Sequence, residues 1–276
     1  MWGEELTEMA DVTFYRSEAL PFLEAKQCTK SDLAYQKHFH GEYSIGLIDE
    51  GETSAWCDGR MYPVEAGRVI SFPPHMLHAC HPRQQTQWKY RMLFIQPDWL
   101  KQLEPGELEQ LRIPFLLEGR KNHDCRRLIC RVVESLASAE EPLVIESWLA
   151  ELIQAIVTPH TLDLDHASRS DREQRYIRLI REYLHAHYTE RVTLEELKRI
   201  AGISRFHLIR LFKKGTNVPP HAYQNLLRIN HAKIALAEKR PIAEIAAEAG
   251  FYDQSHFARA FFKVVGTTPQ RYAVSR

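Results

Sequence analysis

The chain has 276 residues, of which 44% are hydrophobic and 26% are charged, and its 36 basic residues balance its 36 acidic ones. The length exceeds the roughly 100–200 residues of one domain and the hydrophobic content can fill two cores, so the composition excludes a disordered chain and indicates two domains. The first residues are acidic where a secretory signal is basic, and no apolar run reaches the ~18 residues of a membrane span, so we expect a cytoplasmic protein without membrane contact.

Residues 12–96 have the pattern of short β-strands. Hydrophobic residues recur with a period of two in residues 43–47 and 88–94, and the Asp58-Gly59 pair predicts a tight hairpin. A further strand at residues 69–72 ends at Pro73-Pro74, because proline cannot donate to a β-ladder. Several short strands at this spacing predict a small β-barrel or jelly roll.

Four polar residues in this region form a candidate ligand site. His38, His40 and Glu42 are two residues apart, so an extended strand would project all three from one face, and His78 follows the later proline turn. These groups can hold a divalent metal such as zinc, nickel or iron, contact a polar effector with no cofactor required, or form a structural network. All three interpretations stay open. The aromatic residues that could line an effector pocket here, or simply be core, are Tyr43, Trp56 and Trp88.

The five cysteines all lie before residue 131. They are odd in number and have no Cys-x-x-Cys spacing, which indicates reduced thiols in a cytoplasm rather than disulfides. We expect small buried residues at Cys28, Cys57, Cys80, Cys125 and Cys130.

Residues 121–157 have the pattern of two helices. The second helix carries an apolar stripe with Trp148 and Ile153 beside it. This stripe could cover the barrel or pair with its copy in a homodimer, which would double the DNA contacts. Its members are Ile145, Leu149, Leu152 and Ile156. Polar residues then replace the apolar period, so we place domain boundaries at residues 1–160, a linker at 161–172 and a second domain at 173–276.

The last hundred residues contain one helical pattern twice. The segment from Leu194 to Ile203 recurs 48 residues later as Ile242 to Phe251, and the following helix recurs at an offset of 49. Each copy predicts a helix, a short turn containing glycine and a second helix, which is the plan of a helix-turn-helix. Gly202 and Gly250 lie at the turns, where a positive φ favours glycine.

The second helix of each unit separates into two faces at about 100° per residue. Leu208, Leu211 and Phe212 fall on the buried face of the first unit, and Phe257, Ala260 and Phe261 occupy that of the second. An arginine then lies at the centre of each exposed face, where its planar fork matches the O6 and N7 acceptors of guanine. These arginines are Arg210 and Arg259.

A helix predicted over residues 220–238 joins the two units. At 1.5 Å per residue it spans roughly 28 Å, close to the ~34 Å between successive major grooves on one face of DNA. Residues 173–276 contain 18 basic and 9 acidic residues, a net charge of +9, which leaves −9 for residues 1–172. This asymmetry favours a DNA-binding domain over the alternative of a helical bundle with a solvated basic surface.

The repeat resembles the DNA-binding domain of the AraC/XylS family of bacterial transcriptional regulators. The likeness is carried by GFYDQSHFARAFFKVVGTTPQRY, Gly250–Tyr272, and by LEELKRIAGISRFHLIRLFKK, Leu194–Lys214. It implies a sequence-specific regulator that binds double-stranded DNA, with RNA polymerase as a candidate partner. Together with the exposed faces, it designates as DNA-binding residues Arg205, Phe206, Ile209, Arg210, Lys213, Gln254, Ser255, Arg259 and Lys263.

The N-terminal segment is similar to the cupin-like effector domain of the same regulators. We therefore predict a two-domain α+β protein, with an N-terminal cupin-like β-barrel and flanking helices and a C-terminal all-α double helix-turn-helix. A small polar effector would bind His38, His40, Glu42 and His78. The alternative is a metal-dependent cupin enzyme with an appended helical domain, but cupin enzymes place their carboxylate ligand further along, where this chain has Ser44 and Ile45. We therefore expect no enzyme activity.

Overall fold

The computed structural model describes residues 11–31, 33–83, 88–103, 111–159 and 171–275, and the chain divides into two compact units. The N-terminal unit contains Met1–Thr161 with the last two residues, and the C-terminal unit contains Leu162–Val274. The predicted linker lies outside the described residues up to residue 170. Its last two positions, Asp171 and Arg172, are instead the start of a helix.

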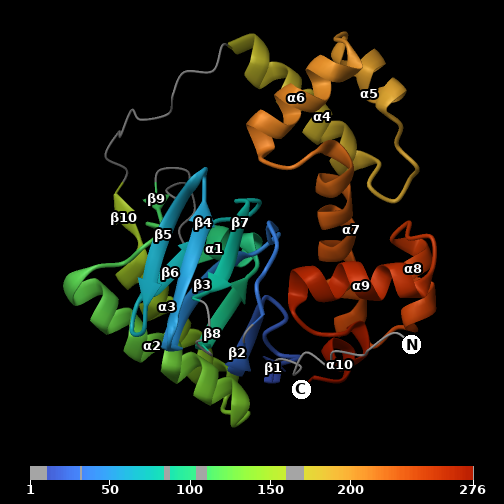
Figure 1. Ribbon diagram of the computed structural model, residues 1–276. Coiled ribbons are helices and arrows are strands. Elements are labelled where there is room, and N and C mark those ends of the chain that lie inside the picture. The colour runs from blue at the N-terminus through green and yellow to red at the C-terminus, as the bar shows by residue number, and fades with distance from the viewer. Residues whose placement is uncertain (1–10, 32, 84–87, 104–110, 160–170, 276) are drawn as a thin grey trace. The chain divides into compact units, whose positions relative to one another are not determined.

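The N-terminal unit contains two larger antiparallel sheets (Figure 1). The larger sheet has the order β1-β2-β8-β3-β6, and the smaller has the order β5-β4-β7. Their bounds are β1 Asp11–Arg16, β2 Leu23–Ser31, β3 Tyr43–Glu50, β4 Glu52–Cys57, β5 Arg60–Glu65, β6 Val69–Phe72, β7 His78–Pro82 and β8 Trp88–Ile95. A short pair, β9 Leu111–Arg112 and β10 Thr158–Pro159, forms a third sheet.

The predicted hairpin is confirmed. Cys57 pairs with Arg60 across a two-residue turn in which Asp58 and Gly59 have φ of 47° and 81°, and this turn matches the right-handed twist of its strands. The predicted barrel is wrong in one respect, because within the described residues the strand pairing does not close the two sheets into a ring. The sheets instead pack face to face over a shared apolar layer from both, including Ile48, Ala55 and Tyr90.

Helices α2, Gly119–Ala137, and α3, Pro142–Ile156, cover the other face of the larger sheet, and α1, Pro97–Leu103, lies beside them. The predicted stripe on α3 is buried here, since Leu149, Leu152 and Ile156 are each 0% exposed and belong to the same core as Ile45 and Leu47 of β3. The stripe therefore covers the sheet, which is the first of the two alternatives given for it.

The C-terminal unit is helical, as predicted (Figure 1). Its helices are α4 Asp171–Ala186, α5 Leu194–Ala201, α6 Arg205–Thr216, α7 Pro220–Ala237, α8 Ile242–Glu248, α9 Gln254–Val265 and α10 Pro269–Val274. Both DNA-reading candidates, α6 and α9, end at left-handed caps, Asn217 with φ 61° and Gly266 with φ 84°. Asparagine and glycine tolerate this conformation best, which explains why the repeat has them at matching positions.

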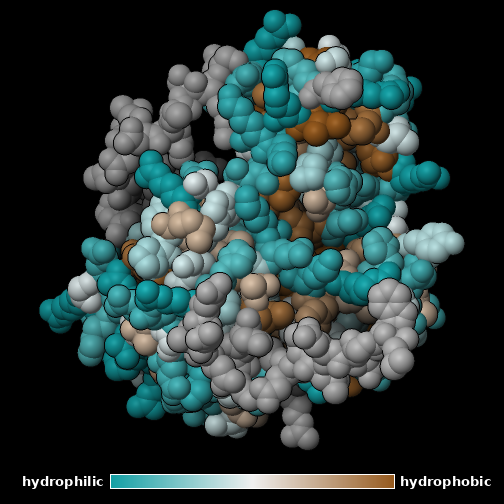
Figure 2. Space-filling view, viewed as in Figure 1, coloured by the Kyte–Doolittle hydropathy of each residue, from teal (hydrophilic) through white to brown (hydrophobic). Residues whose placement is uncertain are grey.

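The surface of the C-terminal unit is mainly hydrophilic, and hydrophobic residues gather where α4, α6 and α7 meet (Figure 2). That position agrees with the contacts among these three helices. No helix in the described part of the chain is both long and apolar enough to cross a bilayer.

Candidate nucleic-acid interface and effector site

The same local signals build both helix-turn-helix units. Gly202 and Gly250 have φ of 67° and 79° at the turns, which confirms the prediction from the repeat. The second helix of each unit then begins at an acceptor side chain. Ser204 accepts from the backbone N–H of residue 207 at 3.3 Å, and Asp253 accepts from that of residue 256 at 2.6 Å. These caps satisfy donors that a helix N-terminus otherwise leaves unpaired, so both helices start at equivalent positions.

Helix α6 has the predicted division into faces. Leu208, Leu211 and Phe212 are at most 4% exposed, whereas the side chains of Arg210 and Lys213 are exposed. Ile209 is half-buried, and the side chain of Phe206 lies outside the described ones. An arginine and a lysine therefore project from the outer face of this helix, where they can meet base edges and phosphates.

Helix α9 repeats this arrangement. Phe257 and Phe261 are fully buried, and Ala260 is only half-buried, contrary to its predicted place on the buried face. A short alanine side chain at the edge of the buried face leaves part of its surface accessible. The exposed residues of α9 include Gln254, Ser255, Arg259 and Lys263, all predicted to contact DNA.

Arg205, at the first position of α6, is held by an acidic neighbour. Its guanidinium donates to Glu195 of α5, with the Nε–Oε2 distance at 2.8 Å, and Lys198 donates to the same carboxylate at 2.9 Å. Hydrogen bonds from Lys198 and Arg205 lower the pKa of Glu195. Glu195 is exposed, and it places a negative charge beside Arg205, which is predicted to bind DNA.

We therefore expect Glu195→Gln to strengthen DNA binding about three- to tenfold at 0.1 M salt, because the freed arginine can neutralise one further phosphate. Fluorescence anisotropy over a range of salt should give a slope steeper by up to about one unit. Glu182→Gln, an exposed change on α4, is the control. Equal affinity in the wild type and Glu195→Gln, or an equal gain in both variants, would show that the ion pair does not limit Arg205.

Helix α7 holds the two helix-turn-helix units of the C-terminal domain together. Gln224, which is 7% exposed, donates to the carbonyls of Tyr188 and Glu190 at 3.1 and 2.8 Å, and Arg228 donates to the same two carbonyls at 2.7 and 2.9 Å. The turn between α4 and α5 is thereby clamped to α7. The 18 residues of α7 span about 27 Å at 1.5 Å per residue. The two helix-turn-helix units are therefore separated by a rigid helix whose length is close to the ~34 Å of one turn of DNA.

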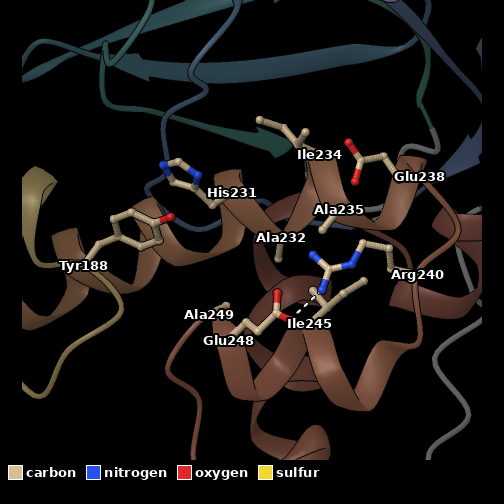
Figure 3. A pocket seen from close by; sticks show the side chains of 10 residues that line it. All are labelled: Tyr188, His231, Ala232, Ile234, Ala235, Glu238, Arg240, Ile245, Glu248 and Ala249. Carbon is tan, nitrogen blue, oxygen red and sulfur yellow. Dashed lines mark hydrogen bonds and ion pairs between the residues drawn. The ribbon is translucent and has the colours of Figure 1, made fainter.

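A groove of about 240 Å³ lies beside α7 and is drawn in Figure 3. Arg240 donates to Glu248 of α8 at 2.5 Å, and the rings of Tyr188 and His231 stack with centroids 4.0 Å apart. Burial lowers the pKa of His231. The ion pair joins the α7–α8 turn to the end of α8, and the stacked rings join α7 to the α4–α5 turn. The groove therefore lies between elements that are held together.

In the N-terminal unit, the layer between the two sheets brings together some of the predicted effector residues. Trp88 packs in it against Tyr90, with centroids 4.4 Å apart. Tyr43 instead packs on the helix-covered face of the larger sheet. Trp56 lies on the opposite face of β4 from its buried neighbours and carries Lys37 Nζ 3.8 Å from its ring centroid. The structure therefore does not bring Tyr43 or Trp56 to the inner layer, because side chains alternate along a strand.

Three of the four predicted polar residues form one cluster. A ring nitrogen from each of His38, His40 and His78 lies within 4.8 Å of the others, and these residues are 5%, 9% and 2% exposed. Glu42 is not part of this group in the described residues, so the predicted four-ligand set is wrong. Residues 38–42 also form no regular strand, because His38 makes only an isolated bridge with His78 and the backbone bends at residues 41 and 42. Burial lowers the pKa of His78 to about 4.

A second polar group in the inner layer was not predicted from the sequence. Lys26, on β2, is 6% exposed, and its Nζ donates to Tyr35 Oη at 2.9 Å. The hydroxyls of Tyr35 and Tyr90 are 2.6 Å apart, and burial raises the pKa of both. The Tyr35 ring also lies 5.8 Å from that of His38, which connects the two groups. The sequence did contain a signal for this group. Lys26 is two residues from Cys28, so on a strand the two side chains share one face, and Cys28 was expected to be buried.

Both units match known families. Residues 27–153 match the AraC-like ligand binding domain, and residues 197–274 match a helix-turn-helix domain. The chain belongs to the AraC family of transcriptional regulators. It is a DNA-binding regulator with an N-terminal ligand-binding domain.

Individual relatives of this AraC-family regulator are distant. The HTH-type transcriptional regulator YbfI of Bacillus subtilis (strain 168) is 28% identical over 80% of this chain and 81% of its own length. The probable transcriptional regulator LumQ of Photobacterium leiognathi is 33% identical over 57% of this chain and 61% of its own. An HTH-type regulator of Staphylococcus aureus is longer, and the chain spans 31% of it.

Among solved structures, ToxT of Vibrio cholerae shares the two-unit fold. The apo form of a ToxT variant matches with a TM-score of 0.56 and 16% identity, over 96% of each chain. Wild-type ToxT with a bound unsaturated fatty acid matches with a TM-score of 0.54 and 15% identity, over 96% of this chain and 94% of that one. At this identity the likeness concerns the fold.

Proposed function

We propose that one chain binds two adjacent DNA half-sites, with α6 in one major groove and α9 in the next. The observation that supports this most is the matched pair of outward arginines, Arg210 and Arg259, on two capped helices of one braced unit. Nine excess positive charges in residues 173–276 supply attraction to phosphates. Arg205, Lys213 and Lys263 would position the helices, while the two arginines read guanines.

The test is to sequence the genomic fragments that the purified full-length protein retains at near-physiological salt. We expect a shared motif with two short half-sites about one helical turn apart, roughly 10 base pairs. Uniform, salt-sensitive retention without a motif, both with and without cell extract as a source of effector, would contradict sequence-specific binding by both units.

The effector is, in our proposal, a small polar molecule bound between the sheets of the N-terminal unit. The ammonium of Lys26 and the hydroxyl of Tyr35 supply donors beside an aromatic wall, which suits an acceptor oxygen such as that of a carboxylate or sugar. The fatty acid bound to ToxT makes carboxylates a sensible first class of probe. Regulation requires the effector to prefer one arrangement of the two units energetically. An effector that saturates the protein yet changes neither DNA affinity nor footprint nor transcription would contradict this role.

Three further parts of the proposal concern partners and location. The chain acts in the cytoplasm, where its DNA is, and contacts RNA polymerase when its site adjoins a promoter. It acts as a homodimer through the outer face of the α2–α3 pair, where the adjacent Leu143 and Val144 of α3 are 75% and 39% exposed. Mass measurement in solution with and without DNA tests the dimer.

We also propose that the protein is a regulator and not an enzyme. Burial raises the pKa of Cys57 and Cys125 to about 11 and that of Cys80 to about 12, so these groups are thiols at neutral pH and poor nucleophiles. Turnover of a small molecule together with no sequence preference on DNA would favour the cupin-enzyme alternative.

A further inference from the structure

The histidine cluster joins two separate segments of the N-terminal unit. His38 and His40 precede β3, and His78 begins β7. The backbone N–H of His38 donates to the carbonyl of His78 at 2.9 Å, and the reverse bond is 2.8 Å. This two-way bridge holds the two segments in register beside their rings. The ring centroids of His38 and His78 are 4.4 Å apart, and His40 lies 4.8 and 5.1 Å from them.

Backbone carbonyls orient two of the three rings and determine which ring nitrogen carries the hydrogen. His38 Nδ1 lies 2.7 Å from the carbonyl oxygen of Gln36, and His78 Nδ1 lies 2.9 Å from that of Met76. A carbonyl oxygen only accepts, so each Nδ1 carries the hydrogen and each Nε2 keeps its lone pair. Metal-binding histidines show this same arrangement, in which the second ring nitrogen donates to a carbonyl and orients the ring.

Aromatic side chains hold the rings in place. Phe72 stacks on His78 with centroids 3.7 Å apart and planes at 11°, and Phe94 meets His40 at 4.9 Å. An apolar wall of this kind limits water and reduces the motion of the ligands, both of which favour a bound ion. With Zn–N bonds of about 2.0–2.1 Å, the nitrogens of a tetrahedral site are about 3.4 Å apart. The observed limit of 4.8 Å therefore requires only a small inward movement of the rings.

We propose that His38, His40 and His78 bind one divalent transition-metal ion of the zinc or cobalt class. Three imidazoles suit these ions, and three protein ligands leave a fourth coordination position open. That position would take water or an oxygen atom of the effector, so the ion would be part of the effector site. This inference builds on the proposed effector role, but metal binding can be measured without knowing the effector or the DNA site.

The experiment titrates chelator-treated full-length protein with Co²⁺ alone and follows visible absorption, because tetrahedral Co²⁺ has strong d–d bands. We expect one Co²⁺ per chain and its displacement by Zn²⁺. His78→Ala and His38→Ala should each weaken Co²⁺ binding at least about 100-fold, more than the 10–100-fold typical of losing an outer-shell partner. His81→Ala is the matched control, since His81 lies on the same strand with an exposed side chain. It should bind as the wild type does.

Folding and DNA binding are monitored on the same samples. His40→Gln, at the more exposed edge of the cluster, is the second variant should the buried substitutions unfold the N-terminal unit. Absence of cobalt bands at millimolar Co²⁺, or equal affinity in the wild type, His78→Ala and His40→Gln, would overturn the metal site and leave the histidines as a structural or effector-contacting group. DNA retention by those samples would still test the proposed function separately.

Discussion

Replacing Arg210 or Arg259 with alanine should weaken binding to the specific DNA site by about 1–3 kcal/mol each, which is roughly 5- to 150-fold. Both side chains are exposed on the outer face of their helices, one before and one after α7 in the chain. An arginine donates two parallel hydrogen bonds to guanine O6 and N7, and an alanine leaves those acceptors without a protein partner. Each substitution should also relax base preference in its own half-site only.

The measurement is fluorescence anisotropy on the selected site and on a shuffled duplex. Arg175→Ala on α4, also exposed, is the control for the loss of one positive charge in the same unit. Lys213→Ala should weaken binding to both duplexes alike and reduce the salt slope by about one, as expected of a phosphate contact. Equal losses on the two duplexes for the arginine variants would mean that Arg210 and Arg259 touch only phosphates.

The second prediction compares two glycines that occupy equivalent turns. Gly202→Ala should cost about 1–2 kcal/mol, the usual cost of left-handed backbone for an alanine, since an added Cβ meets nothing within 4 Å. At Gly250 the same backbone cost applies, but the Cβ would also lie 2.3 Å from the Thr189 carbonyl oxygen and 3.0 Å from Arg228 Nη2. That carbonyl belongs to the turn clamped by Gln224 and Arg228, so it cannot easily move. We therefore expect Gly250→Ala to cost about 3 kcal/mol or more.

Hydrogen exchange of the intact chain can measure this difference element by element. Gly250→Ala should reduce protection in α8 and α9 most, and should weaken binding to the paired site far more than Gly202→Ala does. The reason is that relief of the clash displaces α8 and α9 from the α4–α5 turn. This movement changes the spacing between α6 and α9, the two helices proposed to read DNA. Equal loss of protection at the two glycines would show that the Thr189 contact is not rigid.

Much of the DNA-binding unit could be predicted from the sequence. The duplicated pattern located both turns and the buried faces of α6 and α9, and of the residues predicted to be buried there Ala260 alone is half-buried. These features depend on residues within about four positions of one another, so helical periodicity and backbone sterics determine them. The clamp from α7 was not predicted, because Gln224 and Arg228 bond to carbonyls more than thirty residues away.

The N-terminal unit was predicted less completely. The period of two identified strands, but it does not say which face meets the helices and which meets the second sheet. The sequence could therefore not show that Tyr43 and Trp56 lie outside the layer between the sheets. The apolar stripe of α3 was ambiguous in the same way, because a helix face that packs on a sheet and one that packs on a second chain have the same apolar pattern. Strand pairing across the whole unit determined that the sheets pack face to face instead of closing.

By itself, the sequence determined the two-unit plan, the paired helix-turn-helix and the residues that face outward from α6 and α9. The tertiary structure alone decided that Glu195 restrains Arg205, that Glu42 is separate from the three histidines, and that Lys26 lies buried beside Tyr35. The physical reason is the separation along the chain between the residues that interact. Helix faces, caps and turns follow from local sterics and periodicity, whereas a binding site is assembled by contacts between distant segments whose free energies depend on the packing of the whole unit.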